Sequence, residues 1–140
     1  MDAVLIDASG LIALLDRGDR NHQACVHALA ALKKTDLVTV YPALTEAMHM
    51  LGDTPPGQEA IFDMLEDNVL GVAPLEAADL RRMKALMRKY RDRPMDFADA
   101  ALVRVAERDR LYRILTFDRD FKVYSLPGRQ RFVLVADQSR

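Results

Sequence analysis

The sequence has a single cysteine, Cys25, and no run of apolar residues that approaches the ~20 needed to cross a bilayer. One cysteine excludes an internal disulfide and fits a reducing compartment. The short apolar runs exclude a membrane-spanning helix, and no basic flank leads into the apolar core of a signal peptide. We therefore expect a cytosolic protein with no membrane partner, in which Cys25 belongs to the core.

Net charge is also almost absent, because the two halves of the chain cancel. Residues 1–80 carry 4 Lys/Arg against 13 Asp/Glu, whereas residues 81–140 carry 16 against 8. Much of the positive charge lies in LRRMKALMRKYRDR (80–93), whose cations are Arg81, Arg82, Lys84, Arg88, Lys89, Arg91 and Arg93. This segment is either a solvated helix face or a surface that faces phosphates, and the pattern leaves both open.

Apolar patterns typical of strands and of helices alternate along the chain. They predict strands at 2–6, 37–41, 69–74, 112–118 and 131–136. Helices are predicted from residue 9 to 15, with Ser9 as a possible cap, and at 22–34, 44–51, 58–68, 76–90 and 95–109, with TPPG (54–57) as a break. Because parallel crossovers need a helix, we expect one domain over 1–140 with a parallel α/β/α sandwich.

Acidic residues recur where the predicted elements meet. Asp7 closes the first strand in VLIDASGLIALL, and Asp118 closes the fourth in ILTFD. Glu46 lies in the helix that follows the second strand, and Asp96 and Asp99 open the helix after the basic segment. In parallel sheets the site lies beyond the carboxyl ends of the strands, so these acids are expected to meet at that edge.

When carboxylates lie close together, the repulsion between their negative charges must be offset. Two of them about 4 Å apart repel by ~1 kcal/mol in water and ~4 kcal/mol at the effective dielectric of a protein surface. They hold either protons or a divalent cation, and an all-oxygen shell suits Mg²⁺ or Mn²⁺ better than zinc. The three histidines form no recognisable pair with cysteine, and no HExxH motif is present.

A carboxylate-bound Mg²⁺ takes phosphate oxygens as its remaining ligands, which indicates hydrolysis of phosphate esters. For a polynucleotide substrate, the basic segment would hold the flanking phosphates. The candidates for RNA binding are Arg82, Arg88, Lys89 and Arg91.

Each acid also has a purely structural alternative. Asp7 could merely cap the following helix, as Ser9 could, and Glu46 could belong to a solvated helix face. Asp96 and Asp99 have the spacing of an N-cap and the N3 position of one helix, and we predict that Asp96 is the cap while Asp99 points to the metal. Asp118 is preferred to Asp120 because it directly ends an apolar strand.

The set of Asp7 in VLIDASGLIALL, Glu46 in ALTEAMHML, Asp99 in PMDFADAALV and Asp118 in ILTFDRDF closely resembles the PIN-domain nucleases. The resemblance is greatest to the VapC-like toxins of bacterial type II toxin–antitoxin systems, and it spans nearly the whole chain. It implies a parallel sheet of four or five strands between helices and a Mg²⁺- or Mn²⁺-dependent endoribonuclease. It also implies a homodimer and a cognate antitoxin that inserts into the acidic groove.

Carried over residue by residue, the resemblance places Asp7, Glu46 and Asp99 on the family's three principal acids and Asp118 on its more variable fourth. Thr116 falls on a frequent Ser/Thr two residues before the fourth acid, where a hydroxyl would bind a ligand water or orient Asp118. Asp96 is an extra acid relative to many members.

Other classes of protein fit less well. A phosphorylation-dependent receiver would need two adjacent acids near residue 7 and a lysine ending its last strand, and an aspartate-nucleophile phosphatase would need an Asp where Ser9 stands. A catalytically silent module that binds a basic peptide in the acidic groove, or a nuclease of RNA processing, remains an alternative to the toxin.

Overall fold

Five short strands form one parallel sheet in the computed structural model, which describes residues 3–136. The strands are β1 (Ala3–Ile6), β2 (Asp36–Thr39), β3 (Leu70–Val72), β4 (Arg113–Leu115) and β7 (Val133–Leu134), in the order β3-β2-β1-β4-β7. Every neighbouring pair in this sheet is parallel, which confirms the prediction. Residue 2 of the predicted strand 2–6, and residues 1–2 and 137–140 of the predicted domain, lie outside the described residues.

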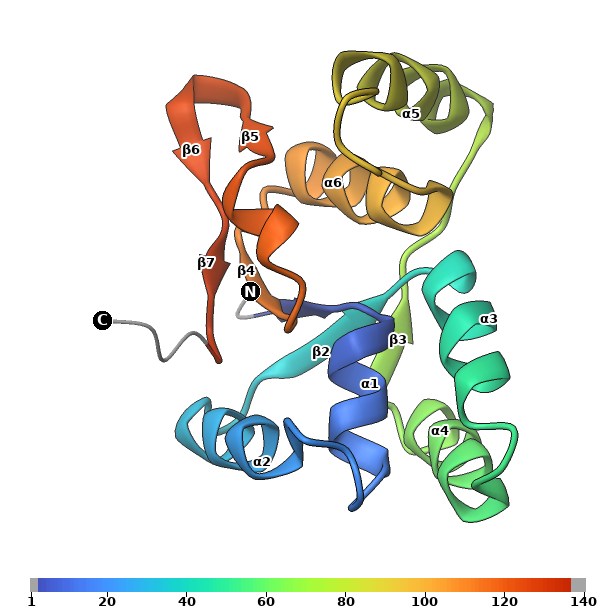
Figure 1. The fold of residues 1–140 in the computed structure, drawn as a ribbon. Coiled ribbons are helices and arrows are strands. Elements are labelled where there is room, and N and C mark those ends of the chain that lie inside the picture. Colours follow the sequence, from blue (N-terminus) through green and yellow to red (C-terminus); the bar gives the residue numbers. More distant parts are fainter. Residues whose placement is uncertain (1–2, 137–140) are drawn as a thin grey trace.

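Helices cover both faces of the sheet (Figure 1). The helices α1 (Ala8–Leu15), α2 (His22–Ala31), α3 (Tyr41–Met50) and α4 (Pro55–Glu66) build the core on one face, and α5 (Ala77–Lys89) and α6 (Phe97–Asp109) build the core on the other. Along β1 the side chains alternate between these cores, with Val4 and Ile6 in the first and Leu5 in the second. The predicted α/β/α sandwich is therefore confirmed, and Cys25 is buried in the first core as expected.

Prolines mark helix starts in two places where the sequence indicated other structure. The sequence predicts a second strand that runs to residue 41 and a break at TPPG (54–57). In the structure Pro42 lies in the first turn of α3, and Pro55 and Pro56 open α4. A proline costs little there, because the first N–H groups of a helix have no partner within it.

A short antiparallel pair was missed by the sequence patterns. Strand β5 (Ser125–Leu126) pairs with β6 (Gln130–Arg131), so the predicted strand 131–136 shortens to β7. The 3-10 turns η1 (Arg119–Lys122) and η2 (Pro127–Arg129) lie before and inside this pair, and Gly128 has the left-handed φ of 71° that its tight turn requires. Within residues 3–136, none of the helices is both long enough and apolar enough to cross a bilayer.

The topology brings several segment ends to one edge of the sheet. Because β1, β2 and β4 are parallel, their carboxyl ends lie at the same edge. Helix α6 runs back toward the start of β4, so its first residues also lie at this edge. At Gly10 helix α1 lies so close to the carbonyl oxygen of Leu115 that a Cβ atom would clash. This close approach sets Asp7 beside Thr116.

Candidate active site

Asp7 lies at the junction of β1 and α1 and is only 6% exposed. Its Oδ1 accepts hydrogen bonds from the backbone N–H of Gly10 at 2.9 Å and from the hydroxyl of Ser9 at 2.7 Å, while its Oδ2 accepts one from the hydroxyl of Thr116 at 2.5 Å. Asp7, not Ser9, caps the helix, because α1 already begins at Ala8. The capping role therefore coexists with a position among the other acids.

Thr116 links Asp7 to Asp118 across two neighbouring strands. While its hydroxyl donates to Asp7, it accepts the backbone N–H of Asp118 at 3.0 Å. Asp118 is partly exposed, and its Oδ1 accepts the N–H of Asp120 at 2.9 Å. Ser9 adds a second link, since its hydroxyl accepts the N–H of Phe117 at 2.9 Å. These bonds fix where the loop after β4 directs Asp118.

Asp96 and Asp99 form the reciprocal cap at the start of α6. Oδ1 of Asp96 accepts the N–H of Asp99 at 2.8 Å, and Oδ2 of Asp99 accepts the N–H of Asp96 at 3.3 Å. The predicted capping role of Asp96 is thus confirmed. Asp99 is 9% exposed, and its Oδ2 also accepts the hydroxyl of the buried Tyr124 at 3.4 Å.

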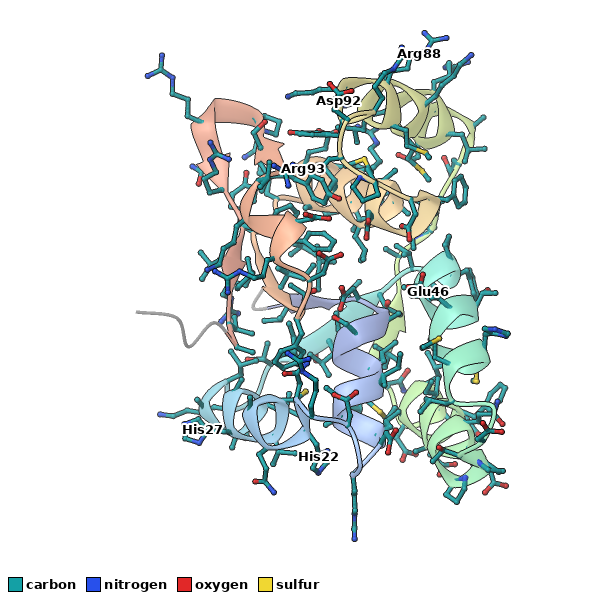
Figure 2. The ribbon with its side chains drawn as sticks, viewed as in Figure 1. His22, His27, Glu46, Arg88, Asp92 and Arg93 are labelled. Atoms are coloured by element: carbon teal, nitrogen blue, oxygen red, sulfur yellow. The ribbon has the colours of Figure 1, made fainter. Side chains whose placement is uncertain are left out.

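Glu46 approaches the same edge from α3. Figure 2 shows it on the side of α3 that is turned toward α1. The residue is exposed, yet partial burial and the negative charges of Asp96, Asp7 and Asp118 raise the pKa of its carboxyl. Glu46 therefore lies within electrostatic range of the other acids, as the sequence predicted for this edge of the sheet.

These carboxylates, which we call the rim acids, are Asp7, Glu46, Asp96, Asp99 and Asp118. Burial is the main cause that raises the pKa of Asp7, with a contribution from Asp118. Burial, followed by the charge of Asp96, raises the pKa of Asp99 to about 7, and Asp118 and Asp7 add to the shift. Burial and the charges of neighbouring rim acids thus disfavour the ionisation of Asp7, Glu46 and Asp99, which is the condition that a bound cation relieves.

A divalent metal fits the chemistry of this donor set, because the rim acids offer only carboxylate oxygens. As the side chains stand, no three His, Cys, Asp or Glu residues between positions 3 and 136 are gathered tightly enough to enclose an ion. The nearby Arg93 pairs with Asp120 at 3.3 Å and not with a rim acid. The site therefore carries the charge that a hard dication requires, without a complete ligand cage.

The sequence patterns did not identify the roles of two residues of the site, Tyr124 and Ser9. Tyr124 contacts Asp99 from a segment with no motif around it, and burial raises its pKa, so that its hydroxyl stays a donor. The sequence suggests Ser9 as a cap, whereas in the structure its hydroxyl bridges Asp7 to the loop after β4. The Asp-Ala-Ser order could have indicated such a bridge, but nothing in the sequence pointed to Tyr124.

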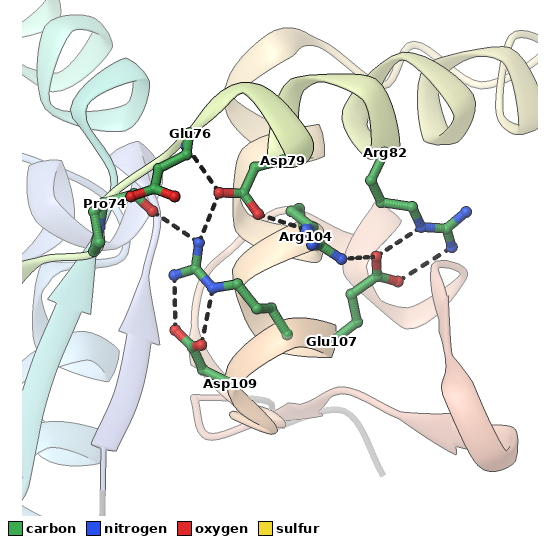
Figure 3. A network of polar contacts seen from close by, with 8 residues as sticks. Pro74, Glu76, Asp79, Arg82, Arg104, Glu107 and Asp109 are labelled. Carbon is green, nitrogen blue, oxygen red and sulfur yellow. Dashed lines mark hydrogen bonds and ion pairs between the residues drawn. The ribbon is translucent and has the colours of Figure 1, made fainter.

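A second group of acids lies between α5 and α6, where Asp79, Glu107 and Asp109 each pair with an arginine (Figure 3). Asp79 accepts from Arg104 at 2.7 Å and from Arg108 at 3.0 Å, and it also accepts the backbone N–H of Glu76 at 2.8 Å. We call the whole group the arginine network; it comprises Asp79, Arg82, Arg104, Glu107, Arg108 and Asp109. The backbone bond from Glu76 and the bond from Arg104 lower the pKa of Asp79, and Arg108 lowers that of Asp109.

The basic segment divides between these internal partners and the surface. Arg82 belongs to the arginine network, with Nε 2.6 Å from Oε1 of Glu107. Lys89 donates to Ser125 at 3.2 Å and lies 5.2 Å above the ring of Tyr90. Arg88 and Arg91 form no ion pair within residues 3–136, and Figure 2 shows Arg88 extending outward from α5.

Comparisons with known proteins agree with this architecture. Ribonuclease VapC26 of Mycobacterium tuberculosis is 29% identical over 136 residues, which cover 94% of this chain and 99% of the relative. The crystal structure of M. tuberculosis VapC20, described as a sarcin-ricin loop cleaving toxin, superposes with a TM-score of 0.77 at 20% identity, covering 86% of this chain and 93% of that one.

A toxin–antitoxin complex from Klebsiella pneumoniae contains a chain with the same fold, at a TM-score of 0.66 and 19% identity over 94% of this chain and 97% of that one. The model of the PIN domain family matches residues 4–126, a span that begins in β1, ends in β5 and contains all five rim acids. The chain therefore belongs to the PIN domain family.

Proposed function

We propose that this protein is a metal-dependent endoribonuclease that hydrolyses RNA phosphodiester bonds and serves as the toxin of a type II toxin–antitoxin pair. The observation that carries the proposal is the rim acids: five carboxylates from four parts of a PIN domain, with raised pKa values at Asp7, Glu46 and Asp99. The likeness to Ribonuclease VapC26 over nearly its full length supports RNA as the substrate.

In this proposal Asp7, Glu46, Asp99 and Asp118 hold Mg²⁺ or Mn²⁺, which when bound supplies an activated water and charge neutralisation at the phosphate. Asp96 holds the start of α6 in place through its cap to Asp99. Thr116 fixes Asp7 and the backbone of Asp118 relative to each other. Tyr124 donates to Asp99 and leaves the other carboxylate oxygen available as a ligand.

The proposed partners are RNA, a cognate antitoxin and a second copy of the chain. Phosphates of the RNA would contact Arg88, Lys89 and Arg91, whereas Arg82 is engaged by Glu107. The presence of a toxin–antitoxin complex among proteins of the same fold supports an antitoxin partner. An antitoxin that occupies the acidic groove would compete with the RNA for the rim acids.

The experiment is cleavage of a broad panel of RNAs by purified protein that has been separated from any partner. We expect cleavage with Mg²⁺ or Mn²⁺, loss of cleavage with EDTA, and recovery when the ion is restored. Asp7→Asn should fold and lose cleavage by at least about 100-fold, since it removes one ligand charge at nearly constant shape. No cleavage of any RNA, together with no metal binding by calorimetry, would favour the hypothesis of a catalytically silent binding module.

A further inference from the structure

Two aromatic side chains stand at the surface beside the rim acids. Tyr41, the first residue of α3, is 69% exposed, and Phe97, the first residue of α6, is 50% exposed. Other aromatic residues of the chain, such as Phe121, Tyr124 and Phe132, are buried and pack edge to face in the core. The exposure of Tyr41 and Phe97 therefore leaves unused apolar area at the site.

Tyr41 and Phe97 line the same hollow, whose volume is about 510 Å³. The rim acids Glu46 and Asp96 line it as well, together with Pro42, Thr45 and Ala98. A hollow of this size is large enough for a small planar group, and the two rings provide flat apolar surface next to the proposed metal ligands. The hollow is thus continuous with the candidate active site.

A second hollow of about 460 Å³ adjoins the first, because Phe97 lines both. Its apolar lining includes Leu80, Met83 and Met87, and its polar lining is cationic, with Lys84, Arg88 and Arg91. Phe97 therefore separates a cationic hollow from an acidic one. An extended ligand chain that passes from the cationic hollow to the acidic one meets positive charge first, then an aromatic ring, then the rim acids.

This order of chemistry selects one class of occupant. A basic peptide would favour the rim acids but would be repelled by Lys84, Arg88 and Arg91, and an acidic peptide would have the opposite conflict. A single RNA strand fits both hollows, because its phosphates match the cations while its bases have apolar faces that stack on aromatic rings. The phosphate at the rim acids would be matched through the bound cation.

We propose that Tyr41 and Phe97 are positioning residues that stack bases of single-stranded RNA next to the bond to be cleaved, with Lys84, Arg88 and Arg91 holding the phosphates on the far side of Phe97. This inference rests on the proposed ribonuclease function. It adds to it the entry path of the strand and a requirement for unpaired, stackable bases. A duplex, whose bases are already stacked on one another, should bind more weakly than a single strand.

The test uses a single-stranded oligoribonucleotide that contains 2-aminopurine, whose fluorescence falls when it stacks on an aromatic ring. Binding is measured in the Asp7→Asn background so that the strand stays intact. We expect Tyr41→Ala and Phe97→Ala each to weaken binding by about 5- to 150-fold and to restore fluorescence, as base–aromatic stacking energies imply. Phe97→Tyr should keep both the affinity and the quenching, whereas Phe97→Leu should lose them although it stays apolar.

The matched control is Phe62→Ala, which removes an aromatic ring of similar exposure, 57%, from α4. It should leave affinity and fluorescence unchanged. Equal affinity and quenching in the parent protein, Phe97→Ala and Tyr41→Ala would overturn the inference, as would a Phe97→Leu variant that behaves like the parent. A change of oligomeric state without a change in RNA binding would also overturn it, because the rings would then serve contact between copies.

The inference and the proposed function fail in different ways. Cleavage by the wild-type chain, with RNA binding that does not depend on Tyr41 and Phe97, would overturn the stacking alone. Absence of both cleavage and RNA binding in the wild-type chain would overturn both.

Discussion

The two groups of acids in this protein are built in opposite ways. In the arginine network, Asp79 is almost fully buried and accepts hydrogen bonds from two guanidinium groups and one backbone N–H. At the rim, Asp99 is buried to a similar degree, but its partners are the backbone of Asp96 and the hydroxyl of Tyr124. The pKa of Asp79 is lowered mainly by the backbone bond from Glu76, while that of Asp99 is raised by burial.

The difference separates acids that stabilise the fold from acids that, in the proposed function, are placed for a ligand. Carboxylates whose charge is satisfied internally favour the folded state at neutral pH, because folding lowers their pKa. Carboxylates gathered without a cation oppose it, and they persist where function requires them. Burial alone does not distinguish Asp79 from Asp99, whereas the direction of the pKa shift does.

The largest effect on stability should come from breaking the arginine network. Asp79→Ala leaves Arg104 and Arg108 without their shared acceptor, so we expect the free energy of unfolding to fall by ~2–4 kcal/mol. This lies below the full cost of breaking a buried pair, since both arginines are partly exposed and solvent screens them. Urea denaturation measures the loss.

The control for Asp79→Ala is Asp109→Ala, which removes a more exposed partner of Arg108 and should cost at most about 1 kcal/mol. RNA cleavage per folded molecule should be unchanged in both variants. If Asp79→Ala reduced cleavage at full folding, the two groups of acids would not be independent.

The sheet and the meeting of the acids could be predicted because both follow from strand direction. Asp7 and Asp118 end apolar runs that are separated by helices, which predicts parallel strands whose carboxyl ends share one edge. That these two strands are neighbours is seen only in the structure. Helix starts were harder, since a proline predicts both a break and a first turn, and Pro42 and Pro55 proved to be the latter.

Contacts between residues that are far apart in the sequence and belong to no motif could not be predicted. Tyr124 reaches Asp99 only because the loop after β4 folds back over α6, and no local pattern encodes that return. The pairing of Arg82 with Glu107 is similar, because the spacing along α5 indicates a cationic face but not which cations α6 neutralises. Sequence patterns therefore located the acids, but they did not separate the compensated group from the uncompensated one.

A second prediction compares how the two groups respond to pH in the metal-free protein. The folded-state pKa of Asp99, about 7, lies above its ordinary value of 3.8, so the folded state holds the proton longer than the unfolded state does. Stability from this residue is therefore present at low pH and is lost as pH rises toward 7. We expect the free energy of unfolding to fall by about 2–3 kcal/mol between pH 5 and pH 8.

Asp99→Asn should remove most of this slope, and saturating Mg²⁺ should flatten it, because ion binding favours the ionised carboxylates. The pKa shift of Asp79 has the opposite sign to that of Asp99. Because folding lowers the pKa of Asp79, the stability that it contributes is lost as pH falls through the acidic range. Unfolding curves at several pH values, with and without Mg²⁺, give both slopes. A metal-free protein whose stability rose between pH 5 and pH 8 would contradict the assignment of the rim acids.

The smallest effect distinguishes the cations of the basic segment. Arg88 and Arg91 have no ion pair within residues 3–136, whereas Arg82 is held by Glu107. Replacing both Arg88 and Arg91 by Gln should lower the slope of log affinity against log salt for single-stranded RNA by about 1.4, since each lost phosphate contact contributes roughly 0.7. Arg82→Gln should leave that slope unchanged and cost at most about 1 kcal/mol of stability. Fluorescence anisotropy over a range of salt concentrations measures the slopes. Equal slopes for the parent and the double variant would show that Arg88 and Arg91 belong to a solvated helix face. In that case the positive charge of α5 has no part in holding RNA.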